Sequence, residues 1–396
     1  MENFTAQIRG PLPSILTLIV TVLWSSAFVM AQTANNQKPK PSGPPKAPPL
    51  PSLKISLEKG DPIIGLPSGA ILGYPPNCSS DGVTYLQFYN PSKETPAFVA
   101  GDLYAITASG KVTRIQREFP QNVRQMVVLS TYAGTHEIAT LISALPKRDP
   151  YNNQYSNTHT YSIALSKSNG QFSKLLPLHL KFQPLKVAVL GSGKFIVLGQ
   201  ETVNRVPVLG VLDTDGSFIR YIDLDNRPFA ASPALRSIYA SKRKTAGTSD
   251  PTMVAVRNSE FVPYKGNILF FQPGSDLDVD VLSAAGELNT IHIKTHKGYL
   301  LQSILPDSAN HQWIIRTQPL STFTQFQKSG VIINPPQRLL QVNPETGEVT
   351  QAIDLTGVHP AEVTCAYDGE LISPHPVYSA TNPKAPTKWT LAAKAY

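Results

Sequence analysis

The sequence is poor in charged residues and in helical patterns. Charged residues make up 16% of its 396 residues, against about a quarter in an average soluble protein. Its 36 prolines are nearly twice the average share of about 5%. After residues 1–31, almost no segment shows the apolar repeat of an amphipathic helix. The composition therefore argues against long surface helices and favours strands and turns.

Catalytic and nucleotide-binding motifs are also missing. The sequence has no Gly-x-Ser-x-Gly elbow, which would mark a hydrolase nucleophile. The segment LKVAVLGSGKFIVLG, Leu185–Gly199, has the outline of a phosphate-binding loop. However, Ala188 replaces the first required glycine, Phe195 replaces the Ser or Thr after the lysine, and a strand follows instead of a helix. We therefore predict no catalytic residues, no cofactor-binding residues and no cofactor.

Basic residues outnumber acidic ones but do not form a nucleic-acid motif. The formal charge of +8 would attract a polyanion at long range. The densest internal group, Lys242, Arg243 and Lys244, lies among small polar residues and is expected to be a solvated loop. No basic strip interleaved with aromatic residues is present to stack bases. We predict that nucleic acid is not a partner.

The histidines do not form a metal-binding pattern. His292 and His296 have the four-residue spacing that chelates a metal from a helix. On a strand, that spacing places them about 13 Å apart, too far to share an ion. His311, His359 and His375 have no Cys, Asp or Glu at ligand spacing. No histidine metal site is predicted.

The acidic residues likewise fit turns and strand faces. Asp276, Asp278 and Asp280 alternate along one predicted strand, without the glycine and further oxygen ligands of a calcium loop. We expect them to form a solvent-facing side of that strand. Asp213 and Asp215 precede a glycine, as a tight turn prefers without any ion. No metal ligand is therefore predicted.

The N-terminal segment is predicted to be a secretory signal. Residues 1–31 contain Arg9, the apolar run SILTLIVTVLW and small or β-branched residues before Ala31. This pattern predicts cleavage after Ala31 and a secreted or periplasmic protein. The alternative is a retained membrane anchor of about 17 residues from Ile15, which is short for a full span. We expect no membrane insertion after signal cleavage.

A proline-rich linker is predicted to follow the signal. Residues 32–52 include seven prolines between Pro39 and Pro51, and they show no apolar periodicity. Such a segment does not bury enough surface to fold, and it favours extended polyproline II. We assign it as a spacer before the folded domain.

One strand–turn–strand pattern occurs five times. The turns end in Gly110, Gly170, Gly216, Gly286 and Gly347. The residue two positions after each glycine is apolar: Val112, Phe172, Phe218, Leu288 and Val349. Alternate positions on the incoming strand are apolar as well, as a strand with one buried face requires. Glycine accepts a positive φ at the turn, so each copy predicts a β-hairpin.

A second glycine signature precedes several of these hairpins. Gly82, Gly193 and Gly266 are each followed by an apolar strand. Together, the two signatures give four antiparallel strands per unit. One such small sheet does not bury both faces alone, whereas stacking units around an axis supplies the missing core. The sequence therefore predicts an all-β fold, a β-propeller of four-stranded blades.

Two matching segments indicate how the ring closes. The pattern Cys-x-x-Asp-Gly occurs at Cys78 and again at Cys365, so the cysteines occupy equivalent positions in the first and last units. Two cysteines in an exported chain most often pair. We predict the disulfide Cys78–Cys365, with a stabilisation on the order of 4 to 5 kcal/mol in the chain-entropy model. The alternative is two separately buried thiols.

The last unit is expected to need a strand from the other end of the chain. No glycine hairpin follows Gly369, so we predict that Leu53–Lys59 supplies an outer strand. This arrangement gives six blades closed by N- and C-terminal strands, and five or seven blades remain as alternatives. We assign residues 53–380 to the propeller and residues 381–396 to a C-terminal tail.

The glycine hairpins, the Asp-Gly segments before strands, the leader and the matching ends carry a family resemblance. From about Leu53 to His375, the chain resembles six-bladed bacterial β-propellers of the NHL and TolB-like group. Proteins of that architecture include metal-dependent lactonases and hydrolases as well as protein-interaction scaffolds. The acidic and asparagine ligands of the lactonase type match no motif here, so the resemblance assigns no site residue.

Two functions from different classes follow. The first is a monomeric, non-catalytic scaffold that binds a protein, glycan or small ligand through variable loops at one end of the ring. The second is a metal-dependent hydrolase or lactonase with a site at the axial channel. Convergence of three or more Asp, Glu, Asn or His side chains at the channel mouth would favour the second.

Overall fold

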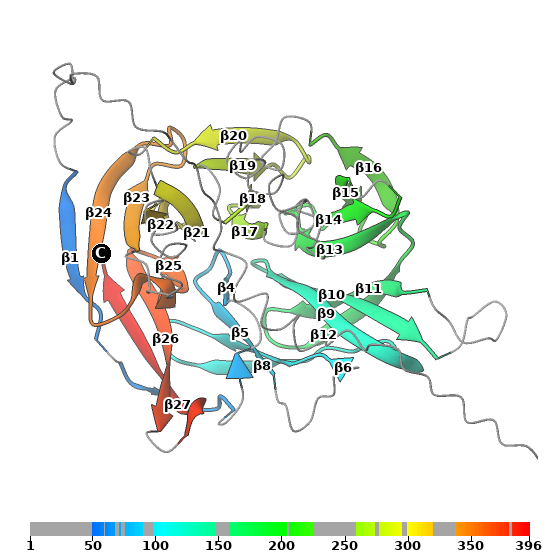
Figure 1. Ribbon diagram of the computed structural model, residues 1–396, viewed down its shortest axis with the longest axis horizontal. Coiled ribbons are helices and arrows are strands. Elements are labelled where there is room, and N and C mark those ends of the chain that lie inside the picture. The colour runs from blue at the N-terminus through cyan, green and yellow to red at the C-terminus, as the bar shows by residue number, and fades with distance from the viewer. Residues whose placement is uncertain are drawn as a thin grey trace, which may run out of the picture.

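The computed structural model shows an all-β protein. It describes residues 50–58, 60–67, 71–72, 76–89, 98–147, 158–203, 206–224, 259–273, 277–294, 299–319, 337–379 and 382–396. The predicted signal segment 1–31 and most of the predicted linker 32–52 lie outside these residues. Six sheets are arranged in a ring around a central axis (Figure 1), which confirms the predicted six-bladed propeller.

The first three blades follow one another along the chain. Blade 1 contains β3 (Ile71–Leu72), β4 (Asn77–Cys78), β5 (Thr84–Tyr89), β7 (Asp102–Ile106) and β8 (Val112–Ile115). Blade 2 contains β9 (Val123–Ala133), β10 (Glu137–Pro146), β11 (Thr160–Lys167) and β12 (Phe172–Leu178), with β6 (Phe98–Val99) parallel to β9. Blade 3 contains β13 (Phe182–Val189), β14 (Phe195–Glu201), β15 (Pro207–Leu212) and β16 (Phe218–Ile222).

The last three blades include both ends of the folded chain. Blade 4 contains β17 (Glu260–Tyr264), β18 (Asn267–Phe271), β19 (Asp278–Leu282) and β20 (Leu288–His292). Blade 5 contains β21 (Tyr299–Asp307), β22 (Gln312–Pro319), β23 (Arg338–Val342), β24 (Val349–Thr356) and β1 (Ser52–Ser56). Blade 6 follows the 3-10 helix η1 (Pro360–Glu362) and contains β25 (Cys365–Tyr367), β26 (Glu370–Ser379), β27 (Asn382–Ala395) and β2 (Pro62–Ile63).

Hydrophobic clusters between neighbouring blades hold the ring together. Between blades 4 and 5, fully buried Trp313 packs among apolar side chains of both blades, including Leu269 and Val342. The rings of Trp313 and Tyr264 meet edge to face, with centroids 5.8 Å apart. Each large side chain buried in this way stabilises the fold by about 1.5–3 kcal/mol. A similar cluster joins blades 3 and 4. Each blade therefore needs neighbours on both sides, as the repeat predicted.

The glycine turns contact the preceding blade as well as turning the chain. All five hairpin glycines have positive φ. A Cβ at Gly347 would lie 2.1 Å from the carbonyl oxygen of His292 in blade 4, and one at Gly170 would lie 2.8 Å from that of Arg114 in blade 1. At these two positions glycine is required by φ and by close approach. The repeated glycine therefore marks a contact between consecutive blades.

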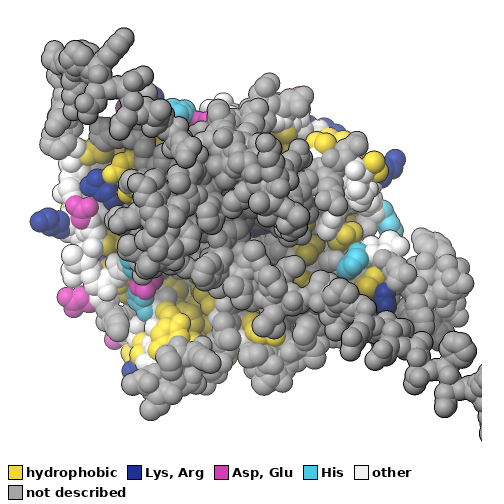
Figure 2. Space-filling view, viewed as in Figure 1, with side chains coloured by type: hydrophobic (Ala, Val, Ile, Leu, Met, Phe, Trp, Pro, Cys, Tyr) yellow, Lys and Arg dark blue, Asp and Glu magenta, His cyan; other side chains and the backbone are white. Residues whose placement is uncertain are grey.

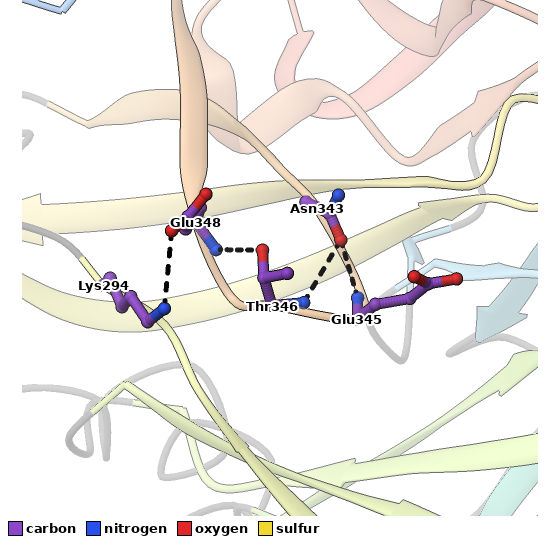
Figure 3. A network of polar contacts seen from close by, with 5 residues as sticks. All are labelled: Lys294, Asn343, Glu345, Thr346 and Glu348. Atoms are coloured by element: carbon purple, nitrogen blue, oxygen red, sulfur yellow. Dashed lines mark hydrogen bonds and ion pairs between the residues drawn. The ribbon is translucent and has the colours of Figure 1, made fainter.

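A polar network fixes the β23–β24 turn in place (Figure 3). Asn343 Oδ1 accepts hydrogen bonds from the backbone N–H groups of Glu345 and Thr346, at 2.8 and 3.2 Å. Thr346 Oγ1 accepts one from the backbone N–H of Glu348 at 3.3 Å. Lys294, which follows β20, forms an ion pair with Glu348 at 3.5 Å. The turn of blade 5 is thus attached to the end of blade 4.

N- and C-terminal strands close the ring, as predicted, but the strands that do so are not the predicted ones. Residues 53–59 were expected to complete the last blade, but β1 pairs in parallel with β24, the outer strand of blade 5. The last blade is completed by β27, which pairs with β26, and by short β2. Residues 381–396 are therefore no separate tail, since 382–395 form β27. The sequence had no second glycine hairpin to reveal this strand.

Candidate functional site

The strand order makes the two ends of the ring different. The turns between the first and second strands, and between the third and fourth, lie at what we call the hairpin end. The connections between the second and third strands, and those between blades, lie at the long-connection end. There the chain runs from Ile222 to Glu260 and from Pro319 to Arg338. The hairpin turns are short by contrast. In the β19–β20 turn, for example, the backbone N–H of Gly286 donates to the carbonyl oxygen of Ser283, three residues earlier, at 2.8 Å.

Basic side chains do not gather in one place on the visible face. Figure 2 shows Lys and Arg scattered over the described part of that surface, without a continuous patch. The densest basic group of the sequence, 242–244, lies outside the described residues. The described surface in this view therefore has no basic strip of the kind that follows a nucleic-acid backbone.

The innermost strands meet closely around the axis. In blade 4, β17 lies within 8 Å, Cα to Cα, of β4 in blade 1 and β9 in blade 2. Lys186 of β13 and Glu260 of β17 form an ion pair at 3.6 Å between the innermost strands of blades 3 and 4. Both side chains are partly exposed. This pair lies where the connection from Ile222 to Glu260 enters blade 4.

A histidine and a glutamate meet between blades 5 and 6. His375 of β26 is buried, and its Nδ1 lies 3.2 Å from Oε2 of Glu362 in η1. Ser373, two residues earlier on the same strand face, donates from Oγ to the backbone oxygen of Glu362. In the sequence, no Cys, Asp or Glu stands at ligand spacing from His375. The pairing arises because the chain between blades returns to the start of blade 6.

A buried carboxylate joins the hairpin turns of blades 5 and 6. Asp307, fully buried at the end of β21, accepts hydrogen bonds in both blades. Its partners are the backbone N–H groups of Ala309, Asn310, Asp368 and Gly369, together with Asn310 Nδ2 and Tyr396 Oη. Burial by itself would raise the pKa of the Asp307 carboxyl, but hydrogen bonds from Asn310, Gly369 and Tyr396 outweigh it and hold that pKa below its ordinary value.

Two of the candidate metal ligands considered in the sequence, His292 and Asp278, lie together. His292 pairs through Nδ1 with Asp278 Oδ1 at 2.6 Å. Asp280 was expected on a solvent-facing side of its strand, but it is fully buried, because packing between blades largely covers both faces of β19. The hydroxyl of Thr290 donates a hydrogen bond to its carboxylate. His296 and Asp276 lie outside the described residues. Within the described ranges, no three His, Cys, Asp or Glu side chains are grouped to hold a metal.

The predicted disulfide is formed. Cys78 in β4 and Cys365 in β25 are bonded, with Cα atoms 5.3 Å apart. Both cysteines are buried beside Ile372. The bond joins the innermost strands of the first and last blades, 287 residues apart in the sequence. In the part of the chain that the structure covers, no helix is long and apolar enough to span a membrane.

Comparison with known proteins assigns neither a family nor a function to this chain. No protein-family model matches the chain, and no curated protein matches it. Among solved structures, a putative TolB from Agrobacterium tumefaciens is 12% identical over 81% of this chain and 89% of its own, with a TM-score of 0.38. XC5397, a gluconolactonase from Xanthomonas campestris, is 15% identical over 55% and 62%, with a TM-score of 0.29. A GH74 xyloglucanase from X. campestris is 10% identical over 85% and 45%, with a TM-score of 0.41. Values this low do not bear on function.

Proposed function

We propose that this protein is a non-catalytic binding scaffold that engages a protein or glycan through the long-connection end of its ring. The observation that carries the proposal is the contrast between the two ends. Hairpin turns are held by glycine contacts to the preceding blade, whereas the connection between Ile222 and Glu260 is much longer than a hairpin turn. Binding residues are commonly placed on loops that a rigid scaffold positions.

We also propose that the protein resides in an oxidising compartment outside the cytoplasm. The disulfide Cys78–Cys365 supports it, because such bonds persist in secreted and periplasmic proteins and are rare in the cytosol. The signal peptide proposed for residues 1–31 and cleavage after Ala31 fit the same compartment. N-terminal sequencing of the exported protein tests the cleavage position, and a mature chain that begins at any residue other than Gln32 contradicts it.

Photo-crosslinking from opposite ends of the ring tests the binding site. Tyr378, exposed at the long-connection end of β26, is replaced by benzoylphenylalanine in the full chain. The matched control carries the same group at exposed Asn169 in a hairpin turn. In envelope or culture-fluid extracts, a discrete adduct is expected from position 378 alone. Adducts from both positions, or from neither, contradict the proposal.

A loop replacement and a metal analysis complete the test. Replacing residues 225–258 with a short Gly-Ser linker is expected to abolish the adduct while leaving the thermal midpoint of unfolding nearly unchanged. Elemental analysis of the purified protein addresses the hydrolase alternative. One equivalent of tightly bound zinc or calcium would replace the scaffold proposal with that of a metal-dependent enzyme.

A further inference from the structure

The interface between blades 5 and 6 changes from apolar to polar along its length. Ile314 of β22 and Leu371 of β26 belong to the hydrophobic cluster that joins these blades. Residues two apart on a strand share a face, so Arg316 follows Ile314 toward the long-connection end. By the same rule, Ser373 and then His375 follow Leu371. Toward the long-connection end, the apolar part of this interface therefore gives way to polar side chains. We call Arg316, Ser373 and His375 the polar layer.

Arg316 lies in this layer, and no described acidic residue forms an ion pair with it. Its Nη1 donates to the backbone oxygen of Ala361 at 3.0 Å, and that is its one partner among the described residues. Its Nε is buried and makes no hydrogen bond. Desolvation lowers the pKa of Arg316 to about 10, which shows that burial disfavours the charged form. A guanidinium has five N–H donors, and one of them is bonded to another described residue.

Two buried hydroxyl groups beside this layer also make no hydrogen bond within the described chain. Ser303 is the direct cross-strand partner of Arg316, and Thr390 is that of His375. Directly opposed residues in a sheet share a face. The Oγ of Ser303 and the Oγ1 of Thr390 are buried and make no hydrogen bond within the described chain. Three unpaired donor atoms therefore border one interface.

The nearest acidic residue of this layer is already paired. Glu362 lies beside Ala361, yet its carboxylate is placed 3.2 Å from His375 and forms no ion pair with Arg316. Ser373 fixes the backbone of Glu362 to β26. Glu362 is about half exposed, so the layer is adjacent to the surface. Within the described ranges, the guanidinium of Arg316 thus has no carboxylate at ion-pair distance.

We propose that Arg316, Ser303 and Thr390 bind a small oxyanion, a carboxylate or phosphate group, between blades 5 and 6. The planar fork of an arginine fits two oxygens of either group, and charge-assisted bonds of this kind are the strong ones. Ser303 and Thr390 contribute buried hydroxyl donors that border the same interface. This site does not depend on the binding scaffold proposed above, and loss of partner binding leaves it unaffected.

Anion titration of the intact protein tests the site. The thermal midpoint and binding isotherms are measured with sodium phosphate and with sodium acetate, against sodium chloride at equal ionic strength. Phosphate or acetate is expected to raise the midpoint above that in chloride, and the two arms identify which oxyanion is preferred. Equal midpoints in all three salts mean that water alone fills the site and overturn the proposal.

Matched variants assign the binding to these residues. Arg316→Met keeps a similar apolar stem and is expected to weaken anion binding at least tenfold, whereas Arg114→Met, at an exposed arginine paired with Asp102, leaves it unchanged. Ser303→Ala and Thr390→Val remove only unpaired hydroxyls, and they are expected to fold normally while binding several-fold more weakly. These two variants decide the question if Arg316→Met fails to fold. Unchanged binding in both of them overturns the proposal.

Discussion

Tyr396 donates a hydrogen bond from its Oη to Oδ2 of Asp307 at 2.7 Å, 89 residues away in the sequence. Its backbone N–H also donates to the oxygen of Gly369 at 2.8 Å. Tyr396 therefore attaches the end of β27 to the turns of both blade 5 and blade 6. Burial and the adjacent carboxylate both raise the pKa of Tyr396, so it stays a neutral donor.

Removing this hydroxyl tests the attachment. Tyr396→Phe keeps the ring and loses the bond to a charged acceptor, which is worth about 1.5–3 kcal/mol in unfolding free energy. Because Asp307 keeps its other partners, we expect a loss near 1.5 kcal/mol, measured by urea unfolding. Tyr378→Phe, at an exposed tyrosine, is the control and is expected to change little. Equal losses in both variants would contradict the role of Tyr396.

The lowered pKa of Asp307 predicts how stability depends on pH. Since the folded-state pKa lies below the unfolded value of about 3.9, the ionised carboxylate stabilises the fold above that value. This contribution is lost as the pH falls through the folded-state pKa. Asp307→Asn is therefore expected to lower stability at neutral pH and to flatten the acid limb of the stability curve. Asp354→Asn, at an exposed position, is the control and should retain the wild-type limb.

The close contact at Gly347 predicts a large effect of one methyl group. Gly347→Ala adds strain at a φ of +70° and brings Cβ against the carbonyl oxygen of His292. We expect a loss of more than about 2 kcal/mol, because the conformational cost alone is about 1–2 kcal/mol. Gly266 has a φ of +75° and nothing within 4 Å of an added Cβ. Gly266→Ala therefore measures the conformational cost alone, and thermal unfolding of the two variants should differ clearly.

The disulfide is expected to contribute strongly to stability. The double variant Cys78→Ser, Cys365→Ser is predicted to lose about 3–5 kcal/mol, because the bond closes a very long loop in the unfolded chain. Alkylation of the native protein without reductant, followed by intact mass, should show no adduct. A loss below about 1 kcal/mol, the range of a surface ion pair, would mean that β2 and β27 close the ring without help.

The sequence predicted the parts of the fold that repeat. Glycine turns with positive φ and apolar alternation recur in five hairpins, so blade count and strand order followed from local patterns. The strand β27 was missed because its residues follow no glycine turn of that type. The parallel pairing of β1 with β24 was missed because an added edge strand leaves no signal in either segment.

The polar sites could not be predicted from the sequence in the same way. Arg316 and Ser303 are opposed only because a register shift in β21 places them so. His375 and Glu362 meet because η1 folds back onto β26. Each pairing depends on the distance between blades, which no local pattern encodes. The disulfide was the exception, since its two cysteines stand at the same position of a repeated motif.

The contrast between the two ends of the ring also matters for protein engineering. Each glycine turn rests on its neighbour, so insertions on that side should disturb the assembly of consecutive units. The opposite side already accommodates segments of very unequal length between neighbouring strands. Foreign recognition peptides could therefore be grafted onto one blade after another at that end, while the rest of the propeller stays unchanged.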